Sequence, residues 1–250
     1  MDEQNGMMPT PTSRGAARAP FEAGYAPAFA LIVLGVPVVL AFGGAGVMGM
    51  NVVIAALMAV FAICSPLRDG MAGHVIAAAA GVVALLVANT RQLATFLFGV
   101  IACTEAHPCP VTMPVWTRMA AWLASVGGLL VVLIVAAFVR QMARAERSHL
   151  IRSLSHTVLE GVAMIAVSGW YFVPDYMALP DEGGNTIVMI TSAVVVVLLA
   201  LALIVASRWW VAEADPDEHA CAPWVGIIVL PTMFAGALVP VAGLLSVMIH

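Results

Sequence analysis

The 250-residue sequence contains no lysine, and charged residues make up only 10% of it. Soluble domains carry about 25% charged residues, so this chain has too few charges to cover a surface that faces water. With 62% hydrophobic residues and a mean hydropathy of +1.03, a soluble globular protein and a disordered protein are both excluded. Four cysteines are too few for a small disulfide-rich fold. We therefore expect a polytopic membrane protein.

Several functional motifs are also missing. Without lysine there is no nucleotide-binding glycine loop, and the sequence contains neither H-E-x-x-H nor G-x-S-x-G. The net charge of −4 provides no basic surface for nucleic acid. The predicted loops are too short to hold a soluble catalytic domain. These absences exclude a primary pump and an enzyme with a soluble domain, and they predict no cofactor.

Long runs without charge are what the sequence does contain. Residues 23–67 form 45 positions between Glu22 and Arg68, which corresponds to about 68 Å of helix. The hydrocarbon core of a bilayer is about 30 Å thick, so this run predicts two spans rather than one. We place them at about 26–43 and 50–66, with the glycine-rich stretch between them as the turn.

Further apolar runs, of which only 154–174 is interrupted by a charged residue, Glu160, predict five more spans, which gives an all-α transmembrane bundle. Their expected positions are 70–90, 119–139, 154–174, 183–207 and 223–248. Tryptophans lie near several of the predicted ends, as is typical of membrane interfaces. Residues 93–103 are too short to cross alone and fit either an interfacial helix or an additional, eighth span.

The distribution of arginine favours seven spans. All ten basic residues are arginines. Seven spans with a cytoplasmic N-terminus place eight arginines inside and two outside, whereas eight spans place six inside and four outside. Since cytoplasmic loops carry the excess of positive charge, we expect seven spans and keep eight as the alternative. We expect residues 1–20 to be a disordered cytoplasmic tail and 21–250 to be a single integral-membrane helical domain.

Glu160 is the acidic residue that falls within a predicted span. On a helix, His149, Arg152 or Ser153, His156 and Glu160 lie three or four residues apart and therefore share one polar stripe. An acid inside a membrane is costly and often functional, so this stripe could relay protons, bind an anionic ligand or contact a partner. The structural alternative is that Glu160 lies about a turn below the interface and pairs with His156 or Arg152.

A second group of reactive residues lies in a predicted external loop. Cys103, Glu105, His107 and Cys109 alternate along the sequence and would share a face if the segment were extended, which suits a soft metal ion. A disulfide between Cys103 and Cys109 is the simpler interpretation, because thiols pair on the oxidising side and no second cysteine pair supports a metal site. We therefore predict the disulfide and assign no metal.

Three classes of function remain. We favour a small permease or channel-like transporter in the bacterial cytoplasmic membrane, a location suggested by the lysine-free, alanine-rich composition. The alternatives are an accessory or scaffold subunit of a larger membrane complex, and a membrane-embedded assembly factor or enzyme. A transporter should have a second embedded polar residue facing Glu160, and His74, Asn89 and Arg91 are the nearby options. The expected partners are the lipid bilayer and a membrane protein or a second copy of the chain.

Overall fold

The fold was obtained as a computed structural model. It describes residues 24, 26–44, 46–67, 70–90, 115–143, 150–182, 185–213 and 222–249, with the backbone alone for residues 42, 115, 150–152, 181–182, 208 and 211–213.

Every element in these described ranges is a helix, which confirms the all-α prediction. In chain order the elements are α2 (Ala26–Phe42), α3 (Gly46–Ile63), α4 (Gly70–Asn89), α6 (Val115–Met142), α7 (Leu150–Ala166), the 3₁₀ helix η1 (Val167–Phe172), α8 (Val173–Ala178), the 3₁₀ helix η2 (Leu179–Glu182), α9 (Thr186–Glu213) and α10 (Pro223–Met248).

These helices form a multi-pass membrane bundle. Within the described residues, six helical segments are long and apolar enough to cross a membrane, and α2 supplies a shorter apolar helix. Each predicted span overlaps one of these helices or, for 154–174, the consecutive segment made by α7, η1 and α8. The limits of α10 agree with the last predicted span. α3 begins and ends earlier than its predicted span, and α6 extends beyond its predicted span at both ends. The predicted tail 1–20 and the segment 93–103 lie outside the described residues.

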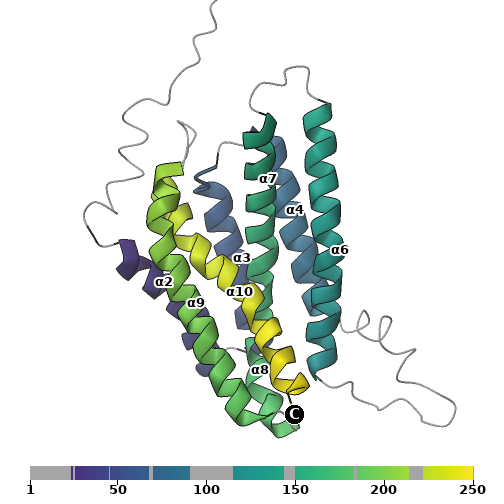
Figure 1. The fold of residues 1–250 in the computed structure, drawn as a ribbon, viewed down its shortest axis with the longest axis vertical. Coiled ribbons are helices and arrows are strands. Elements are labelled where there is room, and N and C mark those ends of the chain that lie inside the picture. The colour runs from purple at the N-terminus through teal and green to yellow at the C-terminus, as the bar shows by residue number, and fades with distance from the viewer. Residues whose placement is uncertain are drawn as a thin grey trace, which may run out of the picture.

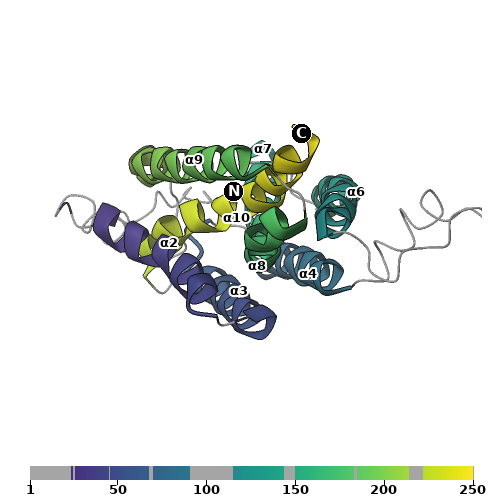
Figure 2. The same ribbon diagram turned by 90° about the horizontal axis from the view of Figure 1, so that it is seen from below.

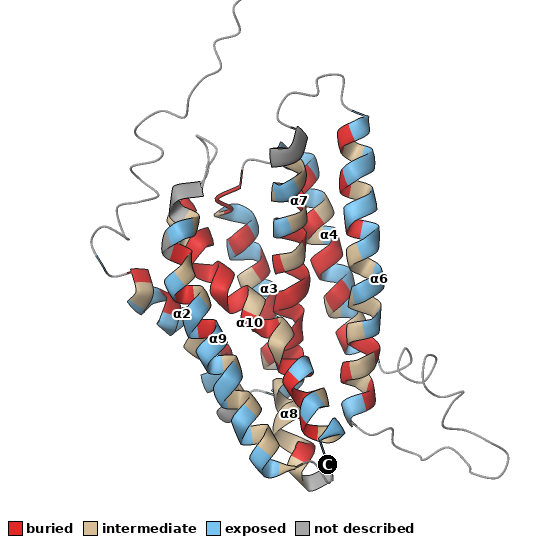
Figure 3. Ribbon diagram, in the orientation of Figure 1, coloured by how far each residue is buried: buried red, intermediate tan, exposed pale blue. Residues whose placement is uncertain are grey.

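α10 is the central helix of the bundle. Figure 2 shows it in the middle, with α2, α3, α4, α6 and α9 around it. Of the most apolar part of α10, 72% is buried, and the segment made by α7, η1 and α8 is buried to the same extent. In α9 the corresponding share is 11%, and Figure 3 shows its outer face as largely exposed. An apolar helix with so little protein contact is suited to face lipid.

The two buried segments touch through their backbones. A Cβ added to Gly169 in η1 would meet the backbone oxygen of Gly236 in α10, and one added to Gly236 would meet the backbone oxygen of Ala166. Small residues of this kind let membrane helices approach closely. Trp170 secures the crossing by donating its indole N–H to the carbonyl oxygen of Thr232 at 2.8 Å.

Candidate functional site

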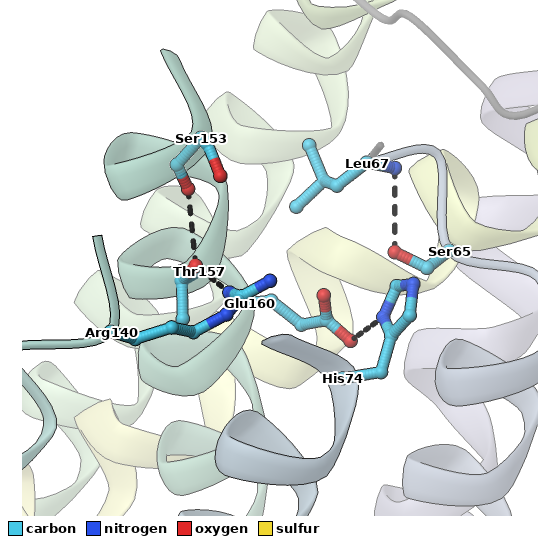
Figure 4. Close-up of polar contacts among 7 residues, drawn as sticks. All are labelled: Ser65, Leu67, His74, Arg140, Ser153, Thr157 and Glu160. Atoms are coloured by element: carbon cyan, nitrogen blue, oxygen red, sulfur yellow. Dashed lines mark hydrogen bonds and ion pairs between the residues drawn. The ribbon is translucent and has the colours of Figure 1, made fainter. Parts of the chain in front are cut away.

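Glu160 lies in the core and is paired with a histidine from another helix. Its side chain has no exposed surface, and its Oε1 atom lies 2.7 Å from Nδ1 of His74 on α4. The side chain of His74 is 28% exposed, so the pair joins a buried acid to a partly accessible base. The second oxygen, Oε2, is buried and has no hydrogen-bond partner among the described residues. Figure 4 shows the two side chains reaching toward each other between their helices.

Small residues on α4 make this pair possible. The buried face of α4 consists of alanine and glycine: Gly73, Ala77, Ala80, Gly81, Ala84 and Ala88. A Cβ on Gly81 would lie 2.9 Å from the Cβ of Met164 on α7, so the two helices are in close contact. His74 lies near the start of α4, at the same end of the bundle as the start of α7. The short imidazole therefore reaches Glu160 directly.

A second polar group joins α6 to α7 next to the pair. Nη1 of Arg140 donates to Oγ1 of Thr157 at 3.0 Å, and this hydroxyl donates to the carbonyl oxygen of Ser153 at 3.1 Å. Gln141 donates to Oγ of Ser153 at 2.5 Å. Thr157 is one turn before Glu160 on α7. Arg140 of α6, Glu160 of α7 and His74 of α4 therefore lie close together at one end of the bundle (Figure 4).

The predicted stripe is placed only in part. Glu160 and His156 both lie on α7, and His156 is half-buried, at the wall of a cavity between α7, α9 and α10. The side chain of Glu160 is fully buried, and its hydrogen bond goes to His74 instead of His156. His149 lies outside the described residues, and only the backbone of Arg152 is described.

The predicted disulfide and the alternative metal ligands cannot be placed. Cys103, Glu105, His107 and Cys109 all lie outside the described residues. Within the described part of the chain, no group of three or more histidine, cysteine, aspartate or glutamate residues could hold a metal ion.

The opposite end of the bundle carries its own polar cluster. Arg118 on α6 donates from Nη2 to the hydroxyl of Tyr171 at 3.0 Å and from Nη1 to Oδ1 of Asp175 at 3.3 Å. The guanidinium carbon of Arg118 also lies 5.6 Å from the ring centroid of Tyr171. These contacts connect α6 to η1 and α8, so we assign this cluster a structural role.

Sequence reasoning found the acid but not the groups around it. His74 appeared only as one of three candidate partners, because no pattern in the sequence relates positions 86 residues apart. Arg140 served only as a marker of topology. The signal available in the sequence was that Arg140 lies in the last turn of an apolar helix, where a long charged side chain can reach neighbouring polar groups.

Comparison with known proteins places the chain in no group: no family model, no curated protein and no solved structure matches it.

Proposed function

We propose that this protein is a small permease or channel-like transporter of the bacterial cytoplasmic membrane that carries protons through the His74–Glu160 pair. The observation that supports the proposal is the pairing of a fully buried carboxyl group with a histidine from a second helix. A transporter should have a second embedded polar residue facing Glu160, and the contact between His74 and Glu160 supports the proposal on this point.

The chemistry of the pair suits proton uptake and release. The imidazole ring of His74 can take up and release a proton, and its side chain is 28% exposed near the start of α4. A charged carboxylate buried in a membrane is costly, and a proton on Glu160 removes that charge. The unpartnered oxygen of Glu160 is a ready acceptor for that proton.

Release on the other side of the membrane requires the bundle to change shape. Beyond Glu160, the chain continues through apolar core residues such as Met164 in α7 and Val167 in η1. The structure contains two elements that permit bending next to this core. They are the 3₁₀ segment η1, and α10 with Pro231 and Pro240 inside it. Transporters commonly use interrupted helices of this kind at their ion sites.

Proton flux in proteoliposomes tests the proposal. Purified protein is reconstituted with a pH-sensitive dye inside, and a potassium diffusion potential is applied with valinomycin. We expect wild-type protein to move protons faster than empty liposomes. Glu160→Gln keeps the size of the side chain and removes the titrating group, so the flux should fall to the level of empty liposomes.

Glu213→Gln is the matched control, because it removes a carboxyl group at the end of α9, beyond the apolar segment that ends at Ser207. It should retain wild-type flux. Wild-type flux in Glu160→Gln would reduce Glu160 to a packing role. Absence of flux in the wild type would overturn the transporter, and a stable protein that co-purifies would then favour the accessory subunit.

A further inference from the structure

The guanidinium group of Arg140 on α6 lies against both helices that carry the His74–Glu160 pair. On α7, its Nη1 atom donates to Oγ1 of Thr157 at 3.0 Å, and Thr157 is three residues before Glu160. On α4, a Cβ added to Gly70 would lie 4.0 Å from its Nη2 atom, and Gly70 is four residues before His74. Each contact is therefore about one helical turn from a member of the pair. Figure 4 shows the three side chains in the same region.

Contacts between α6 and α7 fix the position of this cation. Arg140 lies in the last turn of α6, and the next residue, Gln141, is buried and donates to Oγ of Ser153 at 2.5 Å. Two successive residues of α6 thus hold the same segment of α7. Gly70 begins α4 with a φ of +72°, so no larger side chain separates the guanidinium from the start of that helix.

Few charges accompany Arg140 in this part of the molecule. Apart from Glu160, the sequences of α3, α4, α6, α7, η1 and α10 contain no aspartate or glutamate. Arg68 and Asp69 directly precede α4 in the sequence, and their opposite charges add no net charge. The other charged or titratable groups on the elements packed around the pair are Cys64 after α3, Arg118 on α6, Arg152 and His156 on α7, and Tyr171 in η1. Glu160 is thus the carboxylate on these elements on which the charge of Arg140 acts.

The charge of Arg140 opposes a proton on the pair. An arginine is always positive, and a proton on either His74 or Glu160 adds a second positive charge nearby. Repulsion between like charges is weakened less inside a protein than in water. We propose that Arg140 is a positioning residue whose charge opposes proton binding to the pair, so that the pair releases the proton it takes up. The role in release rests on the proposed proton transport, whereas the effect of the charge on the pair does not.

The reaction of His74 with diethyl pyrocarbonate measures the effect on the pair without any transport. The reagent modifies neutral imidazole, the side chain of His74 is 28% exposed, and mass spectrometry of peptides gives the rate at each pH. The rate in wild-type protein should rise with pH to a plateau. Arg140→Gln removes the charge, so the rise should move to higher pH by about one pH unit while the plateau stays the same. Arg140→Met, a second variant without the charge, should behave in the same way.

Two further variants separate the charge of Arg140 from its hydrogen bond. Arg140→Lys keeps the charge, and Thr157→Val removes the hydroxyl that accepts the bond, so both should keep the wild-type pH dependence of the reaction at His74. His250 is the internal reference, because it follows α10, which ends at the opposite end of the bundle (Figure 1). A wild-type pH dependence in Arg140→Gln would overturn the proposal. A displacement in Thr157→Val as large as in Arg140→Gln would overturn it too, because the contact and not the charge would then matter.

Proton flux in proteoliposomes tests the role in release. In Arg140→Gln, the pH at which the flux is half-maximal should move in the same direction as the reaction of His74, by about one pH unit. A displaced reaction of His74 with a wild-type flux profile would overturn the role of Arg140 in release. Absence of flux in the wild type would overturn the proposed transport, and the reaction of His74 would still decide whether the charge acts on the pair.

Discussion

Glu160 and His74 form the contact on which the candidate site depends. An acid with no exposed surface is tolerated in a membrane only when it is protonated, paired or near water. Among the described residues, the side chain of Glu160 has one hydrogen bond, which joins it to His74. Removal of either side chain therefore leaves the other without its hydrogen-bond partner.

Replacement of the histidine should destabilise the protein. His74→Ala leaves the buried carboxyl group without its partner, which should cost about 3 kcal/mol. The double variant with Glu160→Gln should recover most of this loss, because the acid that needs the partner is then gone. The measurement is the midpoint of heat denaturation in detergent. Val75→Ala, at the next position and 60% exposed, is the control and should change little. A wild-type midpoint in His74→Ala would contradict a stabilising pair.

Cys103 and Cys109 remain a prediction from the sequence. From the sequence we expect both in a loop on the oxidising side of the membrane, where thiols pair. Mass spectrometry of peptides from unreduced protein should show Cys103 linked to Cys109, and reduction should release the link. If both thiols are found unlinked and reactive with maleimide, the alternative with Glu105 and His107 as metal ligands becomes relevant again.

Close contact between elements holds the site in place. α4 presents a face of alanine and glycine to α7, and η1 meets α10 at two glycines. The sequence shows these small residues, but they recur throughout an alanine-rich chain. Only the packing identifies Gly81, Gly169 and Gly236 as contact points. Gly127 and Gly128 attract equal notice in the sequence, yet a Cβ on either would meet nothing within 4 Å.

Substitution at the crossing of η1 and α10 should therefore be harmful. Gly169→Ala places a methyl group against the backbone oxygen of Gly236, which no side-chain movement can relieve. We expect a loss of about 3 kcal/mol, at the upper end for an overpacked core. Heat denaturation and the yield of monodisperse protein measure it. Gly127→Ala on α6 should keep or slightly raise stability, since alanine is the better helix former. Equal behaviour of the two variants would contradict a close crossing.

The whole molecule is an apolar bundle with its polar groups at the two ends. The group around Glu160 and Arg140 lies at the end where α6 leads to α7, and Arg118 and Asp175 lie toward the opposite end (Figure 1). The sides of α6 and α9 are largely exposed and apolar. This distribution is suited to a protein surrounded by lipid along its length and by water at its ends.

Orientation in the membrane can be tested with reporter tags. A tag near residue 146, after α6, should report the cytoplasm, whereas one near residue 179, in η2, should report the external side. The reason is that α7, η1 and α8 together form one span between them. Alkaline phosphatase and green fluorescent protein fusions give opposite signals for the two compartments. The same compartment for both tags would contradict the bundle as a membrane-spanning structure.

Composition and the lengths of the apolar runs by themselves indicated a multi-pass helical membrane protein, because runs of about 20 apolar residues have the length of helices that satisfy their own backbone groups in lipid. Long apolar runs also located the spans, and Glu160 stood out as the acid within one of those spans. The tertiary structure decided which groups surround that acid. His74 and Arg140 come from separate helices, and only the packing of α4 and α6 against α7 brings them to the same place. The periodicity of one helix contains no information about such contacts.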